Sequence, residues 1–259
     1  MTRPASYALI TGASQGLGRF FARALAARKH NLVLVARTEA RLEALAAELR
    51  TTHAVLAEAL AFDLAAPHAG QRLAAELRAR ALEIELLVNN AGFGLRGEFR
   101  KLSLDEQLNM MQLHNTAAVE LTYKLLPAMV ATQRGAIINV SSMAGFQPVP
   151  YAALYSATKA FLTTFSMALR EELRPTGVKV VTVCPGRLAA DPEEVDQAER
   201  QKVPGREQAH AEVVRETLHK LDSGGGLVIP GRLNRWMNFG QRLIPPNAVP
   251  KLIAKRSKP

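Results

Sequence analysis

Short apolar runs alternate with longer amphipathic stretches along most of this chain. The runs are nearly continuous in Val, Ile, Leu and Ala, a composition typical of strands that are buried on both faces of a sheet. They predict strands at 7–11, 31–36, 54–60, 84–89, 136–141, 178–183 and 227–230.

Helical periodicity fills the segments between these runs. It predicts helices at 16–29, 38–50, 67–81, 104–132, 152–174 and 206–221, with the long 104–132 region kinked or broken. Repeated strand–helix units favour a parallel sheet with right-handed crossovers. The predicted fold class is therefore α/β: a single doubly wound domain with a parallel seven-stranded sheet flanked by helices on both faces.

The domain boundary is predicted just after the last strand, because no linker, repeat or low-complexity block interrupts the pattern before it. Residues 1–231 form the expected domain, and 232–259 form a basic amphipathic C-terminal extension. Within the domain, 187–222 is expected to form a lid region over a substrate. Its first part, 187–210, is charged and interrupted by prolines, which suits a surface loop that moves.

Composition is that of a globular protein, with 48% apolar residues in 259. A single cysteine, Cys184, excludes an internal disulfide and fits a reducing compartment. The N-terminal residues lack the apolar core of a secretory signal, and no apolar stretch is long enough to span a bilayer. These features predict a cytoplasmic protein. The six histidines show no spacing typical of metal ligands, so no metal is expected.

The net charge of +10 is concentrated at the C-terminal end. Residues 232–259 carry seven basic residues and no acidic ones, which leaves +3 for the rest of the chain and argues against nucleic acid as the main partner. Apolar residues in the same segment follow helical spacing, namely Leu233, Trp236, Met237, Leu243 and Ile244. Such a helix either packs over the protein itself or makes weak contact with an anionic membrane surface.

The sequence TGASQGLG, residues 11–18, joins the first predicted strand to the first predicted helix. Gly12, Gly16 and Gly18 allow a tight turn and a close approach of the backbone to a phosphate at the helix N-terminus. The turn predicts a dinucleotide site of the Rossmann type, with Ser14, Gln15 and Leu17 also contacting the cofactor. The alternative is a glycine-rich turn without a ligand.

The residue after the second strand indicates which dinucleotide binds. An acidic residue there would bind the free 2′-hydroxyl of NAD, but this chain has Ala36 followed by Arg37. A guanidinium favours a 2′-phosphate through charge-assisted hydrogen bonds, to which Ser14 could add one. We therefore predict NADP(H), the alternative being that Arg37 is a solvated residue opening a helix.

The sequence YSATK, residues 155–159, places a phenol and an ammonium one helical turn apart. A neighbouring cation favours the phenolate, so this pair is a candidate for proton transfer near neutral pH. The alternative is that both residues are simply exposed on the surface, since aromatic and basic residues often share this spacing.

Together with other motifs, these residues resemble the short-chain dehydrogenase/reductase family over residues 7–190. The further motifs are Asp63 in FDL, NNAG at 89–92, Asn115, NVSS at 139–142 and PG at 185–186. The resemblance implies that Asp63 and Leu64 flank the adenine. It also implies a cofactor path lined by Asn90, Ala91, Gly92, Tyr155, Lys159, Pro185 and Gly186.

The resemblance also implies a catalytic set of Asn115, Ser142, Tyr155 and Lys159. In that reading the chain interconverts a carbonyl and an alcohol with NADP(H). Ser142 would hold the carbonyl oxygen and Tyr155 would act as general acid or base. Lys159, with the charge of oxidised nicotinamide, would lower the pKa of Tyr155, and Asn115 would anchor a water. Alternatively, the serine could simply end a strand and the asparagine could be a core amide.

Segments beside these residues predict an apolar substrate pocket that includes Phe93, Met143, Phe146, Gln147 and Tyr151. It suits a ketone, aldehyde or 3-oxoacyl group on an apolar body. The chain departs from the family where Ala190 stands in place of a threonine that holds the nicotinamide, and Arg187 is unexpected.

Two other functions remain open from the sequence. One is a sensor or scaffold that binds NADPH with little turnover, and the other is a membrane-peripheral reductase of lipid carbonyls. The resemblance also implies a homodimer or homotetramer assembled through the helices near 104–132 and 152–174.

Overall fold

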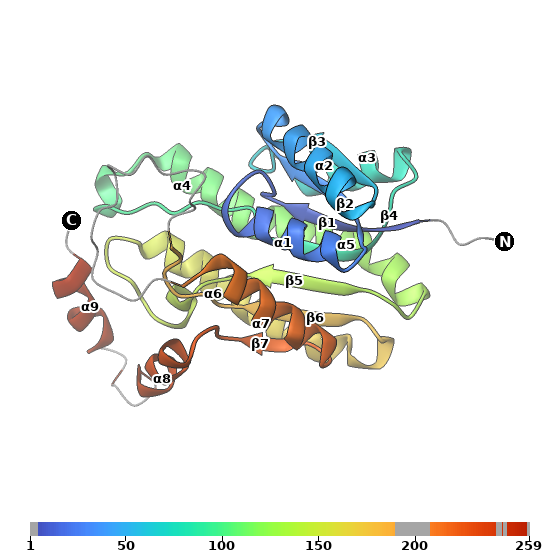
Figure 1. The fold of residues 1–259 in the computed structure, drawn as a ribbon. Coiled ribbons are helices and arrows are strands. Elements are labelled where there is room, and N and C mark those ends of the chain that lie inside the picture. The colour runs from blue at the N-terminus through green and yellow to red at the C-terminus, as the bar shows by residue number, and fades with distance from the viewer. Residues whose placement is uncertain (1–4, 190–207, 242–244, 246–247, 258–259) are drawn as a thin grey trace.

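The computed structural model describes residues 5–189, 208–241, 245 and 248–257. Its centre is a parallel seven-stranded sheet with the order β3-β2-β1-β4-β5-β6-β7, which confirms the predicted fold class (Figure 1). The strands are β1 (Ser6–Thr11), β2 (Asn31–Ala36), β3 (Ala57–Ala61), β4 (Glu83–Asn89), β5 (Ala136–Val140), β6 (Lys179–Val183) and β7 (Gly226–Val228).

Helices cover both faces of the sheet, as the apolar strands require. The helices of the described residues are α1 (Gly16–Ala27), α2 (Glu39–His53), α3 (Ala69–Ala79), α4 (Leu104–Met111), α5 (Ala117–Ala131), α6 (Ala153–Glu172), α7 (His210–Asp222), α8 (Arg232–Gln241) and α9 (Val249–Ser257). Short 3-10 turns occur at η1 (Phe99–Lys101), η3 (Met143–Phe146) and η4 (Arg174–Thr176), and a π turn occurs at η2 (Gln112–Thr116).

The core has two layers because successive strand residues point to opposite faces. In β1, Ala8 and Ile10 join the layer under α1, α2 and α7, and Tyr7 and Leu9 join the layer under α3, α5 and α6. Both layers are built mainly from Leu, Val, Ile and Ala. The strands are therefore buried on both faces, which explains their near-continuous apolar sequence.

The strand order reverses between β1 and β4, where neighbouring crossovers leave in opposite directions. In sheets of this kind a ligand crevice opens at such a point, beyond the carboxyl ends of the strands. Figure 1 shows α4, α8 and α9 at the same end of the molecule, where the strand arrows point. The sheet topology therefore fixes where a site can form.

The π turn η2 interrupts the long helical region that the sequence predicts to be kinked or broken. It separates α4 from α5 and contains His114 and Asn115. A π turn adds one residue to a helical turn and is common at functional sites. The break therefore lies where the sequence places Asn115.

The predicted lid is corrected in its second half. Residues 210–222 form α7, whose Val213, Val214 and Leu218 are buried in the core against the sheet. Because its apolar residues at helical spacing pack in the core, this segment belongs to the helices that cover the sheet and not to a lid. Leu188 and Gln208 pair as an isolated bridge, and residues 190–207, including Ala190, lie outside the described residues.

Candidate active site

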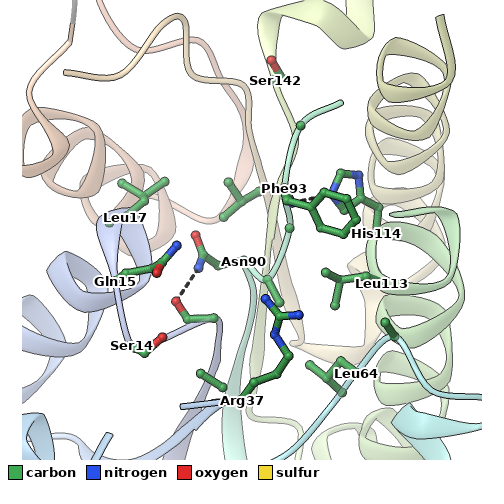
Figure 2. A pocket seen from close by; sticks show the side chains of 18 of the residues that line it. Ser14, Gln15, Leu17, Arg37, Leu64, Asn90, Phe93, Leu113, His114 and Ser142 are labelled. Atoms are coloured by element: carbon green, nitrogen blue, oxygen red, sulfur yellow. Dashed lines mark hydrogen bonds between the residues drawn. The ribbon is translucent and has the colours of Figure 1, made fainter. Parts of the chain in front are cut away.

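A cleft of about 810 Å³ opens at the carboxyl ends of β1 and β4. The glycine-rich turn and Arg37 lie toward one end, and Ser142 lies toward the other, as Figure 2 shows. Segments that are far apart in the sequence meet here because parallel strands end at a common edge. Two further pockets in the described part of the chain are far smaller, at about 10 and 30 Å³.

The glycine-rich turn has the geometry that its sequence predicts. Gly12 has φ +67°, and a Cβ there would come within 2.8 Å of the Ala91 Cα. Gln15 precedes α1 without a side-chain cap, and the first turn of the helix contains no acidic residue. The N-terminus of α1 therefore presents backbone N–H groups and a positive dipole to the cleft, which suits a phosphate.

Gly18 does not line the cleft but holds the helix against the turn. A Cβ at Gly18 would lie 2.1 Å from the Gly12 carbonyl oxygen and 2.6 Å from Asn90 Nδ2. The absence of a side chain therefore allows α1 to pack directly on the turn, a role of glycine in this type of motif.

Gly18→Ala is expected to lower the free energy of unfolding by about 2 kcal/mol, because the added methyl overlaps backbone atoms. Thermal unfolding measures this loss. Gly240→Ala is the matched control, since nothing lies within 4 Å of a Cβ at that helical position. Equal unfolding temperatures for the two variants would contradict the packing role of Gly18.

Backbone contacts fix the NNAG segment beside the turn. Asn90 Nδ2 donates to the carbonyl oxygens of Thr11 and Gly12, at 2.9 and 3.2 Å. The backbone N–H groups of Asn90 and Ala91 donate to Thr11 Oγ1, at 2.9 and 3.0 Å. These bonds tie the ends of β1 and β4 together and give the cleft a rigid floor.

Arg37, Asp63 and Leu64, near the predicted adenosine position, all line the cleft. Figure 2 shows the Arg37 side chain reaching from the end of β2 into the cleft. Asp63 accepts a hydrogen bond from the Ala65 backbone N–H at 3.0 Å, which closes a local turn. The arrangement offers a cation where a 2′-phosphate would lie and no acidic side chain at the end of β2.

The opposite end of the cleft holds Ser142 and Tyr155. Tyr155 lies in the first turn of α6, and Ser142 precedes η3 and accepts the Ala144 N–H at 3.1 Å. Burial raises the pKa of the Tyr155 phenol, while a hydrogen bond with the Ser142 side chain acts in the opposite direction. The phenol is therefore protonated at neutral pH.

Lys159 lies one turn further along α6 and is almost fully buried. Its Nζ donates to the Val140 carbonyl oxygen at 3.0 Å and lies 5.9 Å from the centroid of the Tyr155 ring. Burial lowers the pKa of Lys159 to about 8, so the side chain still carries its proton at neutral pH.

The lowering of the Tyr155 pKa by Lys159 together with oxidised nicotinamide stays a prediction, because the charge of the cofactor is part of it. In the protein alone, burial raises the pKa of Tyr155, and Lys159 is not among the causes of the shift. Desolvation disfavours the charged phenolate, and the ammonium is directed to a backbone carbonyl oxygen.

Asn115 does not line the cleft. Its Nδ2 donates to the Thr158 carbonyl oxygen at 2.9 Å, which joins the π turn η2 to α6. Of the four residues implied as catalytic, Ser142, Tyr155 and Lys159 line the cleft, and Asn115 lies behind it.

Comparison with known proteins gives the family. Residues 6–201 match the short chain dehydrogenase family. The chain belongs to the short-chain dehydrogenase/reductase family. This finding confirms the predicted family, whereas the preference for NADP(H) stays a prediction.

Three similar proteins in this family illustrate its range. A very-long-chain 3-oxoacyl-CoA reductase of Meyerozyma guilliermondii is 38% identical over 186 residues, 68% of this chain and 54% of that protein. A short-chain dehydrogenase of Sphingobium yanoikuyae in complex with NADPH is 35% identical, with a TM-score of 0.80 over 92% of this chain and 94% of that chain. A bulky-bulky ketone specific alcohol dehydrogenase of Comamonas testosteroni is 31% identical, with a TM-score of 0.78 over 92% of each chain. The chain spans about half the length of the Meyerozyma protein.

The cofactor residues implied by the short-chain dehydrogenase/reductase motifs converge on one cleft. All of them except Gly18 line it: Gly12, Ser14, Gln15, Gly16, Leu17, Arg37, Asp63, Leu64, Asn90, Ala91, Gly92, Tyr155, Lys159, Pro185 and Gly186. The uncapped helix end, the close glycine contacts and the single cation at β2 fit a dinucleotide phosphate. These residues would hold the pyrophosphate, the adenosine and the nicotinamide of NAD(P)(H).

The predicted substrate residues do not all reach the site. Phe93 lines the cleft, but Met143, Phe146 and Gln147 are not among its lining residues. Tyr151 lines a separate small pocket beside Gly97 and Phe99. Proximity in sequence to Ser142 therefore does not by itself place a side chain in the cleft.

Several lining residues were missed by sequence reasoning. They are Leu113, His114, Leu188, Glu106, Asn109 and His210. His210 Nε2 lies near the glycine-rich turn, 3.8 Å from a Cβ built on Gly16. A histidine directly before Asn115 was the one signal in the sequence that could have pointed to His114.

Proposed function

We propose that this chain catalyses the NADP(H)-dependent interconversion of a carbonyl and an alcohol, with reduction as the favoured direction. The observation that carries the proposal is that Ser142, Tyr155 and Lys159 line the same cleft as the glycine-rich turn. A phenol that keeps its proton at neutral pH is the form required to protonate an alkoxide.

The chain's residues have distinct roles in this reaction. When bound, the cofactor supplies or accepts the hydride. Ser142 Oγ donates to the substrate carbonyl oxygen, and Tyr155 Oη transfers its proton to the same oxygen as negative charge develops there. The protonated Lys159 side chain adds a positive charge near that oxygen. Asn115 fixes α6 through the Thr158 carbonyl oxygen, which keeps Tyr155 and Lys159 in place.

Arg37 supports NADP(H) over NAD(H), because its guanidinium reaches into the cleft from the end of β2. The NADPH-bound short-chain dehydrogenase of Sphingobium yanoikuyae adds support by similarity. A guanidinium binds a 2′-phosphate strongly and gains little from a 2′-hydroxyl.

An apolar carbonyl compound is the proposed substrate, either a 3-oxoacyl thioester or a ketone with bulky substituents. Phe93, Leu113 and Leu188 are apolar residues of the cleft lining. The similar proteins that act on 3-oxoacyl-CoA and on bulky ketones support the same class.

The test is consumption of NADPH by the wild-type protein with a panel of ketones, aldehydes and 3-oxoacyl thioesters of graded chain length, with the alcohol product identified by mass spectrometry. We expect turnover that increases with apolar size. An NADPH-binding sensor or scaffold would instead bind NADPH tightly and turn over none of the panel, a result that would overturn the proposal.

A membrane-peripheral reductase is a second candidate, favoured by one surface. The α8 face consists of Leu233, Trp236 and Met237, which follow helical spacing and are exposed, Trp236 to 70%. Arg232 and Lys251 lie in the same C-terminal helices, and neither helix contains an acidic residue. An exposed apolar face among cations suits anionic lipid. No helix in the described part of the chain is long and apolar enough to cross a bilayer.

We expect the protein to co-sediment with vesicles containing anionic phospholipid at low salt and to be released at high salt, because surface charge attraction is screened. Trp236→Ser should weaken binding several-fold, since the α8 face loses its largest apolar side chain. Leu56→Ser is the control, because Leu56 is exposed away from the α8 face. Absence of co-sedimentation, or self-association that depends on Trp236, would end this candidate.

A homodimer or homotetramer assembled through α5 and α6 is also proposed. Tyr123 on α5 and Phe161 and Met167 on α6 are large side chains exposed in the monomer. Burying them against a second copy would remove apolar surface from water. Light scattering should give twice or four times the monomer mass, and Phe161→Glu should lower it. A monomer at micromolar concentration would contradict the proposal.

A further inference from the structure

His114 is a buried polar side chain that the proposed reaction does not use. It lies on the π turn η2, directly before Asn115, and only 2% of its surface is exposed. Its ring fills the space between the loop after β4 and the first turns of α6, where Lys159 and Tyr155 are the ionisable groups facing it. Burial and the nearby Lys159 charge lower the pKa of His114 to about 2, so the ring is neutral at any working pH.

The hydrogen bonds of His114 determine which ring nitrogen carries the proton. The Phe93 backbone N–H donates to Nε2 at 3.1 Å, which requires that nitrogen to be unprotonated (Figure 2). The proton of the neutral ring is therefore on Nδ1, which lies 2.9 Å from Thr158 Oγ1. Thr158 Oγ1 in turn donates to the Tyr155 carbonyl oxygen at 2.8 Å. These hydrogen bonds connect Phe93 in the cleft wall, through His114 and Thr158, to the backbone of Tyr155, the proposed proton donor. We call this series of bonds the His114 chain.

Ring packing reinforces the same connection. The His114 ring meets the Tyr155 ring edge-on, with centroids 5.9 Å apart at 75°, and meets the Phe93 ring with centroids 6.1 Å apart at 64°. A Cβ on Gly92 would lie 2.7 Å from Nε2, so only glycine lets this loop approach the ring. His114 therefore touches the apolar wall and the proton donor at once.

The π turn explains how the consecutive residues His114 and Asn115 can both bind Thr158 on α6. Side chains of consecutive residues in a regular α-helix diverge by about 100°. Here the His114 side chain faces the Thr158 hydroxyl, and the Asn115 side chain binds the Thr158 carbonyl oxygen. The extra residue of the π turn brings both side chains to α6.

We propose that His114 is a positioning residue for the reaction: through Thr158 it fixes the backbone of Tyr155, and through Phe93 it fixes the wall against which the substrate lies. The inference rests on the proposed function. Loss of the His114 chain leaves Tyr155 present but loosely held, and a proton donor misplaced by a fraction of an ångström transfers its proton more slowly.

Thr158→Val tests this chain by removing the central hydroxyl while keeping the side-chain shape. We expect kcat to fall about five- to tenfold, the effect of one lost hydrogen bond, with the NADPH dissociation constant within about twofold of wild type. The conservative Thr158→Ser variant should rescue most of the loss. His114→Phe keeps the ring but loses both hydrogen bonds, and it should also raise KM for bulky ketones because Phe93 loses its anchor.

The double variant is expected to be no worse than His114→Phe alone, because the two residues act in one chain. Additive losses, or a wild-type kcat in Thr158→Val, would overturn the proposal. The Thr158 variants keep the test decisive if His114→Phe does not fold.

A second readout does not depend on turnover. Ultraviolet titration of tyrosinate, taken as the difference from Tyr155→Phe, gives the pKa of the Tyr155 phenol. We expect Thr158→Val to bring that pKa down toward its ordinary value as water reaches the loosened phenol. If wild type turns over no substrate but this shift appears, the proposed function fails and the positioning role stands. An unchanged phenol pKa would overturn the positioning role.

Discussion

Tyr155→Phe is expected to lower kcat by about a thousandfold, within the range typical of a lost general acid. Phenylalanine keeps the ring in its edge-on contact with His114 and removes only the hydroxyl. The NADPH dissociation constant should stay within about twofold of wild type, because the glycine-rich turn and Arg37 are unchanged. Steady-state kinetics and NADPH fluorescence titration measure the two quantities.

Tyr123→Phe is the matched control for this experiment. It makes the same chemical change on α5, at a side chain that does not line the cleft, and it keeps the ring that the proposed interface would bury, so kcat should be unaltered. If Tyr155→Phe retained a tenth or more of wild-type kcat, proton donation by Tyr155 would be refuted. Loss of NADPH binding in that variant would instead assign Tyr155 to cofactor binding.

Arg37→Ala is expected to raise the dissociation constant of NADPH about 10- to 100-fold and to leave that of NADH nearly unchanged. The range follows from losing one charge-assisted contact, about 1.5–3 kcal/mol. The preference for NADPH in the wild type should also weaken with salt, because the contact is ionic and exposed. Titration of both cofactors by calorimetry at two salt concentrations measures these effects.

Arg28→Ala controls for the change in net charge. Arg28 lies past the end of α1, where it pairs with Asp222, and it is not a cleft residue. It should bind both cofactors like wild type. Equal affinity of the wild type for NADPH and NADH would contradict the role given to Arg37.

The sheet was predictable because its strands are buried on both faces and therefore read as apolar runs. The boundaries of helices and strands were less predictable where backbone conformation determines them. The helix expected at 38–50 continues to His53 and ends at Ala54, which has φ +52°. Alanine is not a residue that signals such a helix end. The strand expected from residue 54 therefore begins at Ala57.

The cofactor side of the site was predictable because its residues sit at strand ends and in a glycine-rich turn. The substrate side was less predictable, since Leu113 and His114 of η2 line the cleft, whereas Met143 and Phe146 of η3 do not. His114 is a particular case, because its partners Phe93 and Thr158 are distant in sequence. The raised pKa of Tyr155 also escaped prediction, because it depends on burial that spacing along one helix does not report.

Transfer of deuterium from NADPH labelled at the reactive carbon of nicotinamide tests the central claim most directly. The wild-type protein should place a single deuterium on the carbinol carbon of the alcohol formed from a bulky ketone or a 3-oxoacyl thioester, as seen by mass spectrometry. Tyr155→Phe should form that product about a thousandfold more slowly. An alcohol without deuterium, or equal rates in the two proteins, would contradict a carbonyl reductase that uses Tyr155 as its acid.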